Sequence, residues 1–305
     1  MQTVAKNWEK PASHRNSGIF GSVVKNMLFY LAIFALLCLV VGPFLWMIIS
    51  SISTQVELSS TPPHWIPQNP TLFRYEALFT GVGKGLANLP LGVEKFLRGL
   101  TNSLIVSTLT TIVCVTTGTL AAYALARMNV PGKNKFMMAI LSSQMIPVIV
   151  IIIPLYLLLQ KFDMMDSLRG LVLLYTGFML PTVIWIMHSY FLTLPHELEE
   201  AAMIDGCNRF QALLKVIIPL SGPGLVAVSA FAFLSSWNEF FMALIFTGAN
   251  TKTITVTVTE FSSQFGVDFG LMATGGVIGS IPPLVLAFLL QKYIVAGLTA
   301  GSVKG

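Results

Sequence analysis

The amino-acid sequence predicts an all-α membrane protein with about six transmembrane helices. Hydrophobic residues make up 54% of the 305-residue chain, and charged residues make up only 10%. In a typical soluble domain about a quarter of the residues are charged. So few charges cannot cover a surface that faces water, and the apolar excess therefore faces lipid. Each spanning segment must be helical, because lipid offers no hydrogen-bond partner to a free backbone amide.

Six apolar stretches have roughly the 20 residues that a spanning helix needs. They cover residues 28–50, 102–125, 136–160, 170–191, 217–246 and 277–296. The first stretch is longer than the apolar core of a signal peptide, so we expect it to be retained as the first helix. Prolines within the stretches predict kinks, because each proline removes a helix hydrogen bond. These prolines are Pro147, Pro154, Pro181, Pro282 and Pro283.

The distribution of Lys and Arg predicts the orientation of the chain. Basic residues are enriched in cytoplasmic loops, and here they occur in both tails and in the loops after the second and fourth stretches. With six spans, these four segments share one side of the membrane. We therefore predict a cytoplasmic N-terminal tail (1–27), a transmembrane domain (28–296) and a cytoplasmic C-terminal tail (297–305).

Two segments on the other side of the membrane have recognisable patterns. Residues 72–79 have the spacing of a short amphipathic helix within a loop that is rich in Pro and Gly. Between the last two stretches, Ile254, Val256 and Val258 alternate with threonines. This period of two predicts a strand or an extended segment.

The loop between the fourth and fifth stretches has the pattern of two helices joined by a glycine turn. Pro195 and the acidic residues after it suit the first turn of a helix and the positive end of its dipole. Gly206 can end that helix in a left-handed conformation. Asn208 followed by Gln211 resembles the capping box of a second helix, which continues into the fifth stretch.

The first of these two helices has a surface that suits a partner. It is acidic on one side and small and apolar at Ala201 and Ala202. A helix of this kind can dock into a groove on a cytoplasmic protein. A solvated amphipathic connector between two spans fits the same pattern.

The same loop resembles a known family signature. Glu200-Ala201-Ala202, Gly206 and Pro219 are similar to the EAA signature of ABC importer permeases, with Val216 and Ile218 where Ile and Leu are usual. Further segments are similar to permeases of carbohydrate importers. These are Asn102-Ser103-Leu104, Ala121-Ala122-Tyr123-Ala124-Leu125-Ala126-Arg127, Trp237-Asn238-Glu239-Phe240 and the ending Gly297 to Gly305, which is similar to that of maltose-type permeases.

The resemblance implies a type I, maltose-permease-like fold in the bacterial cytoplasmic (inner) membrane. It implies a heterodimer with a second permease subunit, two copies of an ATPase subunit and an extracytoplasmic sugar-binding protein. Residues 192–219 would be the coupling loop, in which Glu200 holds a basic ATPase residue and Gly206 allows the sharp turn. The C-terminal tail would also reach the ATPase, and the outer loop between the last two spans would contact the binding protein.

The residues that the resemblance assigns to ATPase coupling are Glu200, Ala201, Ala202, Asp205 and Gly206. The implied solute is a sugar, with a disaccharide or an oligosaccharide expected and glycerol phosphate or a related polyol as the alternative.

Candidate pathway residues lie near the outer end of the fifth stretch. Glu239 stands beside Asn238 and Trp237. Acidic residues at membrane depth are costly and often functional, and aromatic and polar groups suit a sugar. The alternative is that Glu239 anchors a helix end at the water interface. We expect His188 and Gln144, which also lie within apolar stretches, to be satisfied packing or interface groups.

The sequence also indicates what the chain does not do. Gly83-Lys84 and Gly132-Lys133 lack the flanking residues of a phosphate-binding loop, so we expect a non-catalytic subunit whose ATP hydrolysis comes from a partner. The three cysteines lack the spacing of a metal site or a disulfide framework, and we expect no cofactor. The basic residues are dispersed between apolar runs, which argues against a nucleic-acid partner.

Two other function classes fit the sequence less well than the importer hypothesis. A secondary transporter needs ion-coupling acids inside its spans, and only Glu239 comes near one. A membrane-embedded enzyme needs a polar catalytic cluster at membrane depth, and the sequence has no such pattern.

Overall fold

The structure is a computed structural model that describes residues 16–62, 64–81, 91–263 and 266–300. The predicted tails, 1–27 and 297–305, and the Gly83-Lys84 pair lie partly or wholly outside these residues. The elements are α1 (Asn16–Ile52), α2 (Gln55–Leu58), α3 (Phe73–Thr80), α4 (Leu91–Arg127), α5 (Lys133–Ser143), α6 (Val148–Lys161), α7 (Leu168–Thr193), α8 (Glu197–Ile204), α9 (Arg209–Ala212), the π-helical turn η1 (Leu213–Ile217), α10 (Ile218–Leu220), α11 (Gly222–Trp237), α12 (Phe241–Phe246), α13 (Ile254–Thr259), β1 (Ser262–Ser263), β2 (Gly266–Val267) and α14 (Phe269–Ala300). The two short strands are antiparallel.

The described residues contain four helices that are long and apolar enough to cross a membrane. They lie within α1, α4, α7 and α14. Two bent pairs pass the same test, α5 with α6 and the α9–α10 segment with α11, and each pair counted as one span raises the number to six. The prediction of an all-α membrane protein with about six spans is therefore confirmed.

The third predicted span, 136–160, is not one straight helix. It divides into α5 and α6, which meet at an angle of 95°. Pro147 precedes α6 with an extended backbone (φ −61°, ψ 132°). Proline disfavours the helical conformation in the residue before it, so the chain leaves the helix here. Pro154 and Pro181, by contrast, remain inside α6 and α7.

The fifth predicted span, 217–246, is also divided. The chain bends by 81° between the α9–α10 segment and α11. Pro219 provides no amide hydrogen, and the π-helical turn η1 comes directly before it. At the other end α11 stops at Trp237, and residues 241–246 form the separate helix α12.

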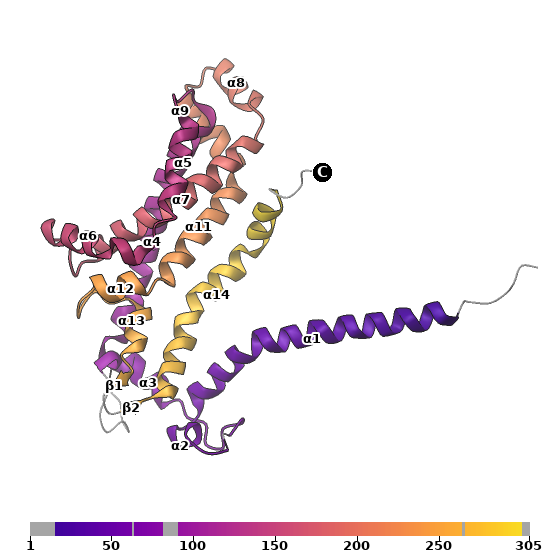
Figure 1. Cartoon of the computed structure of the whole chain (residues 1–305), viewed down its shortest axis with the longest axis vertical. Helices are drawn as coiled ribbons and strands as arrows, with labels where there is room; N and C mark the ends of the chain where they lie inside the picture. Colours follow the sequence, from indigo (N-terminus) through magenta and orange to yellow (C-terminus); the bar gives the residue numbers. More distant parts are fainter. Residues whose placement is uncertain (1–15, 63, 82–90, 264–265, 301–305) are drawn as a thin grey trace, which may run out of the picture.

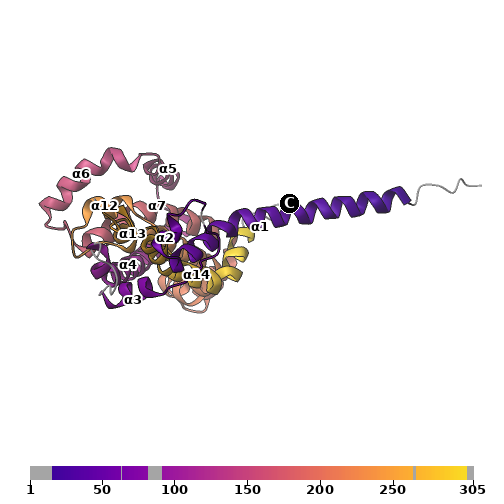
Figure 2. The same ribbon diagram turned by 90° about the horizontal axis from the view of Figure 1, so that it is seen from below.

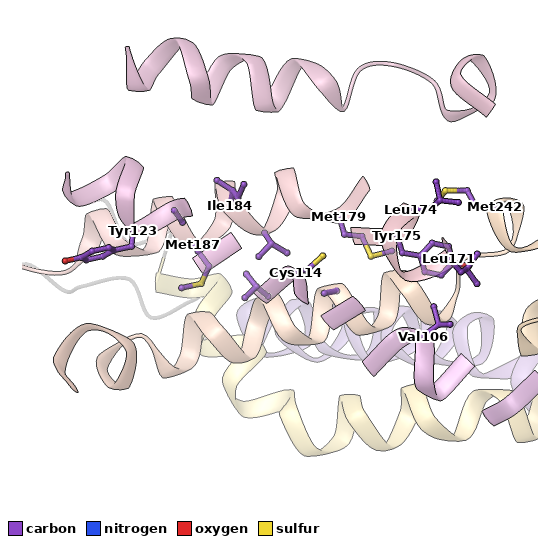
Figure 3. Packing of buried hydrophobic residues seen from close by; sticks show 14 of the residues in the cluster. Val106, Cys114, Tyr123, Leu171, Leu174, Tyr175, Met179, Ile184, Met187 and Met242 are labelled. Atoms are coloured by element: carbon purple, nitrogen blue, oxygen red, sulfur yellow. The ribbon is translucent and has the colours of Figure 1, made fainter. Parts of the chain in front are cut away.

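Helices α4, α7 and α11 lie side by side and enclose the larger hydrophobic core (Figures 1 and 3). Glycines permit the close approach of their backbones. A Cβ atom on Gly118 of α4 would lie 2.7 Å from Val183 of α7, and one on Gly224 of α11 would lie 2.8 Å from the Tyr190 ring. Side chains of any size at these two positions would separate the helices.

A second core closes the end of the molecule that carries α2 and α3, called here the α3 end. The predicted helix at 72–79 is confirmed as α3. Its Arg74 is fully buried, donates to the carbonyl of Ser53 and pairs with Asp268 at 3.3 Å. Burial lowers the pKa of Arg74, and the Asp268 carboxylate opposes that effect. The ion pair joins α3 to the residue before α14, and the hydrogen bond to Ser53 joins α3 to the residue after α1.

The strand or extended segment predicted at Ile254, Val256 and Val258 is wrong, because these residues form α13. Ile254, Val256 and Thr257 are buried, which is a helical pattern of one-sided burial rather than an alternation. Packing of this face against α4 and α14 outweighs the strand preference of β-branched residues.

Helix α1 extends away from the other helices (Figures 1 and 2). Only its C-terminal part contacts α14, where a Cβ atom on Gly276 would lie 2.9 Å from the sulfur of Met47. Within its most apolar window of 18 residues, 0% is buried. The free length of α1 therefore requires lipid or another protein around it.

Candidate functional site

The helix–turn–helix formed by α8 and α9 lies at the end of the molecule opposite α3 (Figure 1). We call this the α8 end. Three acidic residues, Glu197, Glu199 and Glu200, occupy the first turn of α8. Their charges are placed favourably at the positive end of the helix dipole.

Gly206 ends α8 in the left-handed conformation that the sequence predicts, with φ +89°. The amide of Cys207 donates to the carbonyl of Ala202 at 3.0 Å, and the amide of Gly206 donates to that of Met203 at 3.1 Å. An added Cβ atom on Gly206 would meet nothing within 4 Å. The glycine is therefore required for the backbone conformation and not for lack of space.

The predicted capping box at the start of α9 is confirmed. The amide of Gln211 donates to the side chain of Asn208, and the amide of Asn208 donates to the side chain of Gln211, both at 2.9 Å. The direction in which the chain enters α9 is thus determined within four residues.

Helix α8 has two chemically different faces. Glu199 and Ala202 are buried against the rest of the chain, with Glu199 only 4% exposed. The opposite face is open to the surroundings and carries carboxylates together with an apolar side chain, Ile204, that is 86% exposed. Of the predicted coupling residues, the exposed ones are Glu200, Ala201, Asp205 and Gly206.

The buried face of α8 is held by α4. The Tyr123 hydroxyl donates to Oε1 of Glu199 at 2.6 Å. One turn further along α4, Nη2 of Arg127 donates to the carbonyls of Phe191 and Leu194, both at 2.7 Å. Figure 3 shows Tyr123 at the end of the row of buried apolar side chains, with its oxygen pointing away from them.

Sequence reasoning did not find these contacts. The segment around Tyr123 and Arg127 carried only the family resemblance, and Glu199 was expected only to suit the positive end of the helix dipole. Tyr123 and Arg127 are four residues apart and so share one face of α4. Two polar residues on one face near the end of an apolar span are the signal that could have indicated an anchor for the adjacent loop.

The structure brings the three predicted pathway residues together at the break between α11 and α12. Trp237 is 2% exposed, donates to the carbonyl of Gly279 at 3.1 Å and stacks on Phe233. Asn238 is exposed and donates to the carbonyl of Leu234. The Glu239 carboxylate accepts from two amides of α12, at 2.8 and 3.1 Å. All three side chains have partners within the chain.

A cavity of about 450 Å³ lies between the α5–α6 bend and α7. Its lining is almost entirely apolar, with Ser143 and Gln144 among the few polar side chains. Gln144 donates to the carbonyl of Phe178 at 2.8 Å, as expected of a satisfied packing group. So apolar a cavity offers few partners for the hydroxyl groups of a sugar. Within the described ranges, no group of three or more His, Cys, Asp or Glu side chains is placed to hold a metal ion.

Comparison with known proteins gives a consistent result. Residues 114–300 match the family model described as binding-protein-dependent transport system inner membrane component. A sulfoquinovosyl glycerol transport system permease of Agrobacterium fabrum is 33% identical, with 86% of this chain and 88% of the relative aligned. A trehalose transport system permease of Mycobacterium tuberculosis is 36% identical, with 88% and 95% aligned.

A solved structure shares the fold. A chain of a bacterial ABC transporter involved in the import of the acidic polysaccharide alginate superposes with a TM-score of 0.72 at 22% identity. The match covers 93% of this chain and 99% of that one. Together with the sequence relatives, it confirms the resemblance drawn from the sequence. The chain belongs to the binding-protein-dependent transport system inner membrane components, the permease family of ABC importers.

Proposed function

We propose that this chain forms half of the translocation pathway of an ATP-driven, binding-protein-dependent sugar importer and is driven through α8. The observation that carries the proposal is the two-faced helix α8. Its outer face presents Glu200, Ala201 and Ile204 at the end of the bundle, and its inner face is bonded to the long helix α4. A helix placed in this way can be displaced by a bound partner and can transmit that displacement to the membrane helices.

The partner at the α8 end is an ATPase subunit, of which two copies serve the assembled importer. The exposed surface of the loop 192–219 combines acidic side chains with the apolar side chains of Ile204 and Phe210. This mixture suits a groove with an apolar floor and a basic residue at its edge. We assign Glu200 to the basic residue, and Gly206 to the turn that lets α8 protrude. On this assignment the α8 end and both tails are cytoplasmic.

The second partner is another permease subunit. The free length of α1 exposes large apolar side chains along nearly its whole surface, among them Phe34 and Leu39. A second subunit packed on this helix would complete the pathway, for which the single chain supplies only one wall. The chain itself is non-catalytic, and the ATPase supplies the hydrolysis of ATP.

The third partner, an extracytoplasmic sugar-binding protein, docks at the α3 end. Residues 247–253, called here the α12–α13 loop, are held against α4 by Asn102, and Ser103 bonds the amide of Ile254 directly after the loop. A loop fixed in this way is a suitable rigid contact surface. We place Asn238 nearest to the solute path, because it is exposed at the break, while Trp237 and Glu239 hold the break together.

The solute is a glycoside of disaccharide or oligosaccharide size. Both relatives described above are named for solutes that contain a sugar linked to a second polar unit. The importer would therefore accept molecules with many hydroxyl groups, and the binding protein would select one solute among such molecules.

The test is reconstitution of the complex that co-purifies with the tagged chain. We expect a P-loop ATPase and a second multi-span protein in the purified complex. In liposomes with the cognate binding protein, a panel of radiolabelled glycosides that begins with trehalose should show ATP-dependent uptake of at least one member. A chain that purifies alone and transports solute along an ion gradient would contradict the proposal.

A further inference from the structure

A single side chain joins α4 to both helices of the coupling loop. The Tyr123 hydroxyl donates to the Glu199 carboxyl group of α8 at 2.6 Å and lies 3.4 Å from the backbone carbonyl of Arg209 in α9. Tyr123 and Glu199 are both buried. Within the described residues, this is the one side-chain hydrogen bond between α8 and another long helix. Ala202, the other buried residue of α8, has only a methyl group and offers no comparable anchor.

Arg127 strengthens the same attachment from one turn away. Its guanidinium group bonds the last carbonyls of α7, at Phe191 and Leu194, directly before α8 begins. The Phe191 carbonyl also accepts from the amide of Leu194 at 3.3 Å, and a cation is favourable at this end of the helix dipole. The Tyr123 ring also packs edge-on against Phe191 at 6.1 Å. The end of α4 therefore holds both the end of α7 and the buried face of α8.

The other end of the same helix holds the α12–α13 loop. The side chain of Asn102 donates to the carbonyls of Asn250 and Lys252, both at 3.0 Å, and the Ser103 hydroxyl accepts from the amide of Ile254 at 2.8 Å. The 20 helical steps from Ser103 to Tyr123 span about 30 Å of unbroken helix. One rigid element thus makes side-chain hydrogen bonds to two loops that lie about 30 Å apart along its axis.

We infer that Tyr123 and Glu199 are positioning residues that make α8 and α4 move as one unit, so that displacement of α8 reaches the α12–α13 loop. The inference rests on the proposed function, in which α8 receives the movement of the ATPase. Without the bond, α8 would shift while α4 stayed in place. ATP would then be hydrolysed without a matching change in access to the solute.

The physical basis is the burial of the bond. Loss of the Tyr123 hydroxyl removes the hydrogen bond that favours the attached position of α8. It also leaves the Glu199 carboxyl group buried without its partner, which lowers the stability of the folded chain and thus its assembly. A hydrogen bond to a carboxylate typically changes such an equilibrium by on the order of tenfold. The ratio of solute imported to ATP hydrolysed should fall by a similar factor.

The experiment uses the complete transporter in liposomes, with its binding protein and trehalose, or another glycoside from the uptake panel. For Tyr123→Phe we expect about a tenfold lower ratio of solute imported to ATP hydrolysed. Tyr156→Phe on α6 is the matched control, because its hydroxyl has no hydrogen-bond partner in the described part of the chain. That variant should keep the wild-type ratio.

A double variant separates positioning from stability. Tyr123→Phe/Glu199→Leu removes both partners and leaves no buried carboxyl group unsatisfied, so assembly should recover. We expect the transport ratio to stay as low as in Tyr123→Phe, because the link itself is absent. A purely structural role predicts that the ratio recovers together with assembly, and that result would overturn the inference.

The outcomes distinguish this inference from the proposed function. A wild-type ratio in an assembled Tyr123→Phe complex would reject the positioning role and leave the importer assignment intact. Absence of ATP-dependent uptake in the wild-type complex with every glycoside of the panel would reject the proposed function, and the inference with it. The variant Glu199→Leu, measured alone, completes the comparison. If the loss of the transport ratio in Tyr123→Phe/Glu199→Leu equals the product of the losses in Tyr123→Phe and Glu199→Leu, the inference is also rejected, since independent residues combine in that way.

Discussion

The two ends of α4 hold their loops in different ways. Toward the α3 end, three side chains of α4 bond the α12–α13 loop or its junction with α13, namely Arg98, Asn102 and Ser103. Most of these bonds are made to backbone atoms of the loop and of Ile254. Asp166 adds bonds to Gly248 and Thr251 of the same loop. At the α8 end, the bond between Tyr123 and Glu199 joins two side chains, and the outer face of α8 is open.

Close packing increases this difference. A Cβ atom on Gly99 of α4 would lie 2.5 Å from the Thr257 hydroxyl oxygen of α13, and one on Gly92 would lie 2.8 Å from the Thr257 carbonyl. Helix α13 is thus pressed against the backbone of α4. The turn at Gly206, by contrast, has open space around it. The comparison indicates a tightly held segment at the α3 end and a loop with an open outer face at the α8 end, which are the properties that the proposed contact surface and the proposed coupling loop require.

The strongest test of the comparison is charge reversal on the open face of α8. Glu200→Lys should abolish ATP-dependent uptake, because a lysine repels the basic ATPase residue that we assign to this position. Membrane insertion should be unchanged, since Glu200 has no buried contact. The control is Glu76→Lys, an equivalent change on the exposed side of α3. Full uptake in Glu200→Lys would remove Glu200 from the coupling surface.

A smaller effect is expected at the turn. Gly206 has φ +89°, and a side chain in the left-handed region costs roughly 1 kcal/mol. Gly206→Ala should therefore lower the uptake rate severalfold while the complex still assembles. Gly222→Ala is the control, because the space around that glycine is equally open and its φ is not positive. An unchanged uptake rate for Gly206→Ala would show that coupling does not depend on the left-handed conformation at residue 206.

We expect a weaker effect on transport from changes toward the α3 end, because several hydrogen bonds together hold the α12–α13 loop. Asn102→Ala removes two hydrogen bonds to the α12–α13 loop, each of which contributes about 1 kcal/mol. Hydrogen exchange of the loop amides should become faster, and affinity for the binding protein should fall by a few fold. Thr101→Ala is the neighbouring control, since its hydroxyl bonds only the carbonyl of Leu97 within α4. Equal exchange rates in the two variants would show that the loop does not depend on Asn102.

The smallest effect concerns acid pH. Backbone hydrogen bonds from Thr54, and then from Asn69 and Gln68, hold the pKa of Glu57 below its ordinary value of 4.5, against the opposing effect of burial. A lowered pKa means that the ionised form stabilises the folded loop. This contribution is complete above pH 4.5 and is lost as the pH falls through the lower value in the folded protein. The protection factors of the Gln68 and Asn69 amides, which compare their exchange with that of an unstructured chain at the same pH, should fall on acidification in the wild type and depend less on pH in Glu57→Gln.

The sequence predicted best the features that neighbouring residues determine. The stop at Gly206 and the capping box of Asn208 and Gln211 depend on residues within four positions of one another, and both are present. The number of spans and the helix α3 likewise follow from local hydrophobicity and spacing.

The features that the sequence missed depend on distant contacts. Helix α13 forms where Ser103, 151 residues earlier, accepts from the amide of Ile254. The bond between Tyr123 and Glu199 joins residues 76 positions apart. The chain breaks at Pro147 and after Trp237, so a pair of shorter helices stands in place of each predicted single helix. Such a break is stable where other groups bond the backbone amides that it leaves free. The Glu239 carboxylate, for example, accepts from two amides at the start of α12.

The central claim is that the open face of α8 contacts an ATPase subunit. The most direct measurement is site-specific cross-linking from Ile204→Cys in a variant whose native Cys38, Cys114 and Cys207 have been replaced. Ile204 is 86% exposed in the single chain, so a cysteine at this position is accessible to a partner that docks on α8. We expect a cross-link from a short thiol-reactive photoprobe at this position to the ATPase subunit in native membranes. Labelling of the same cysteine by an impermeant reagent from the outside of intact cells, without a cross-link to the ATPase, would contradict it.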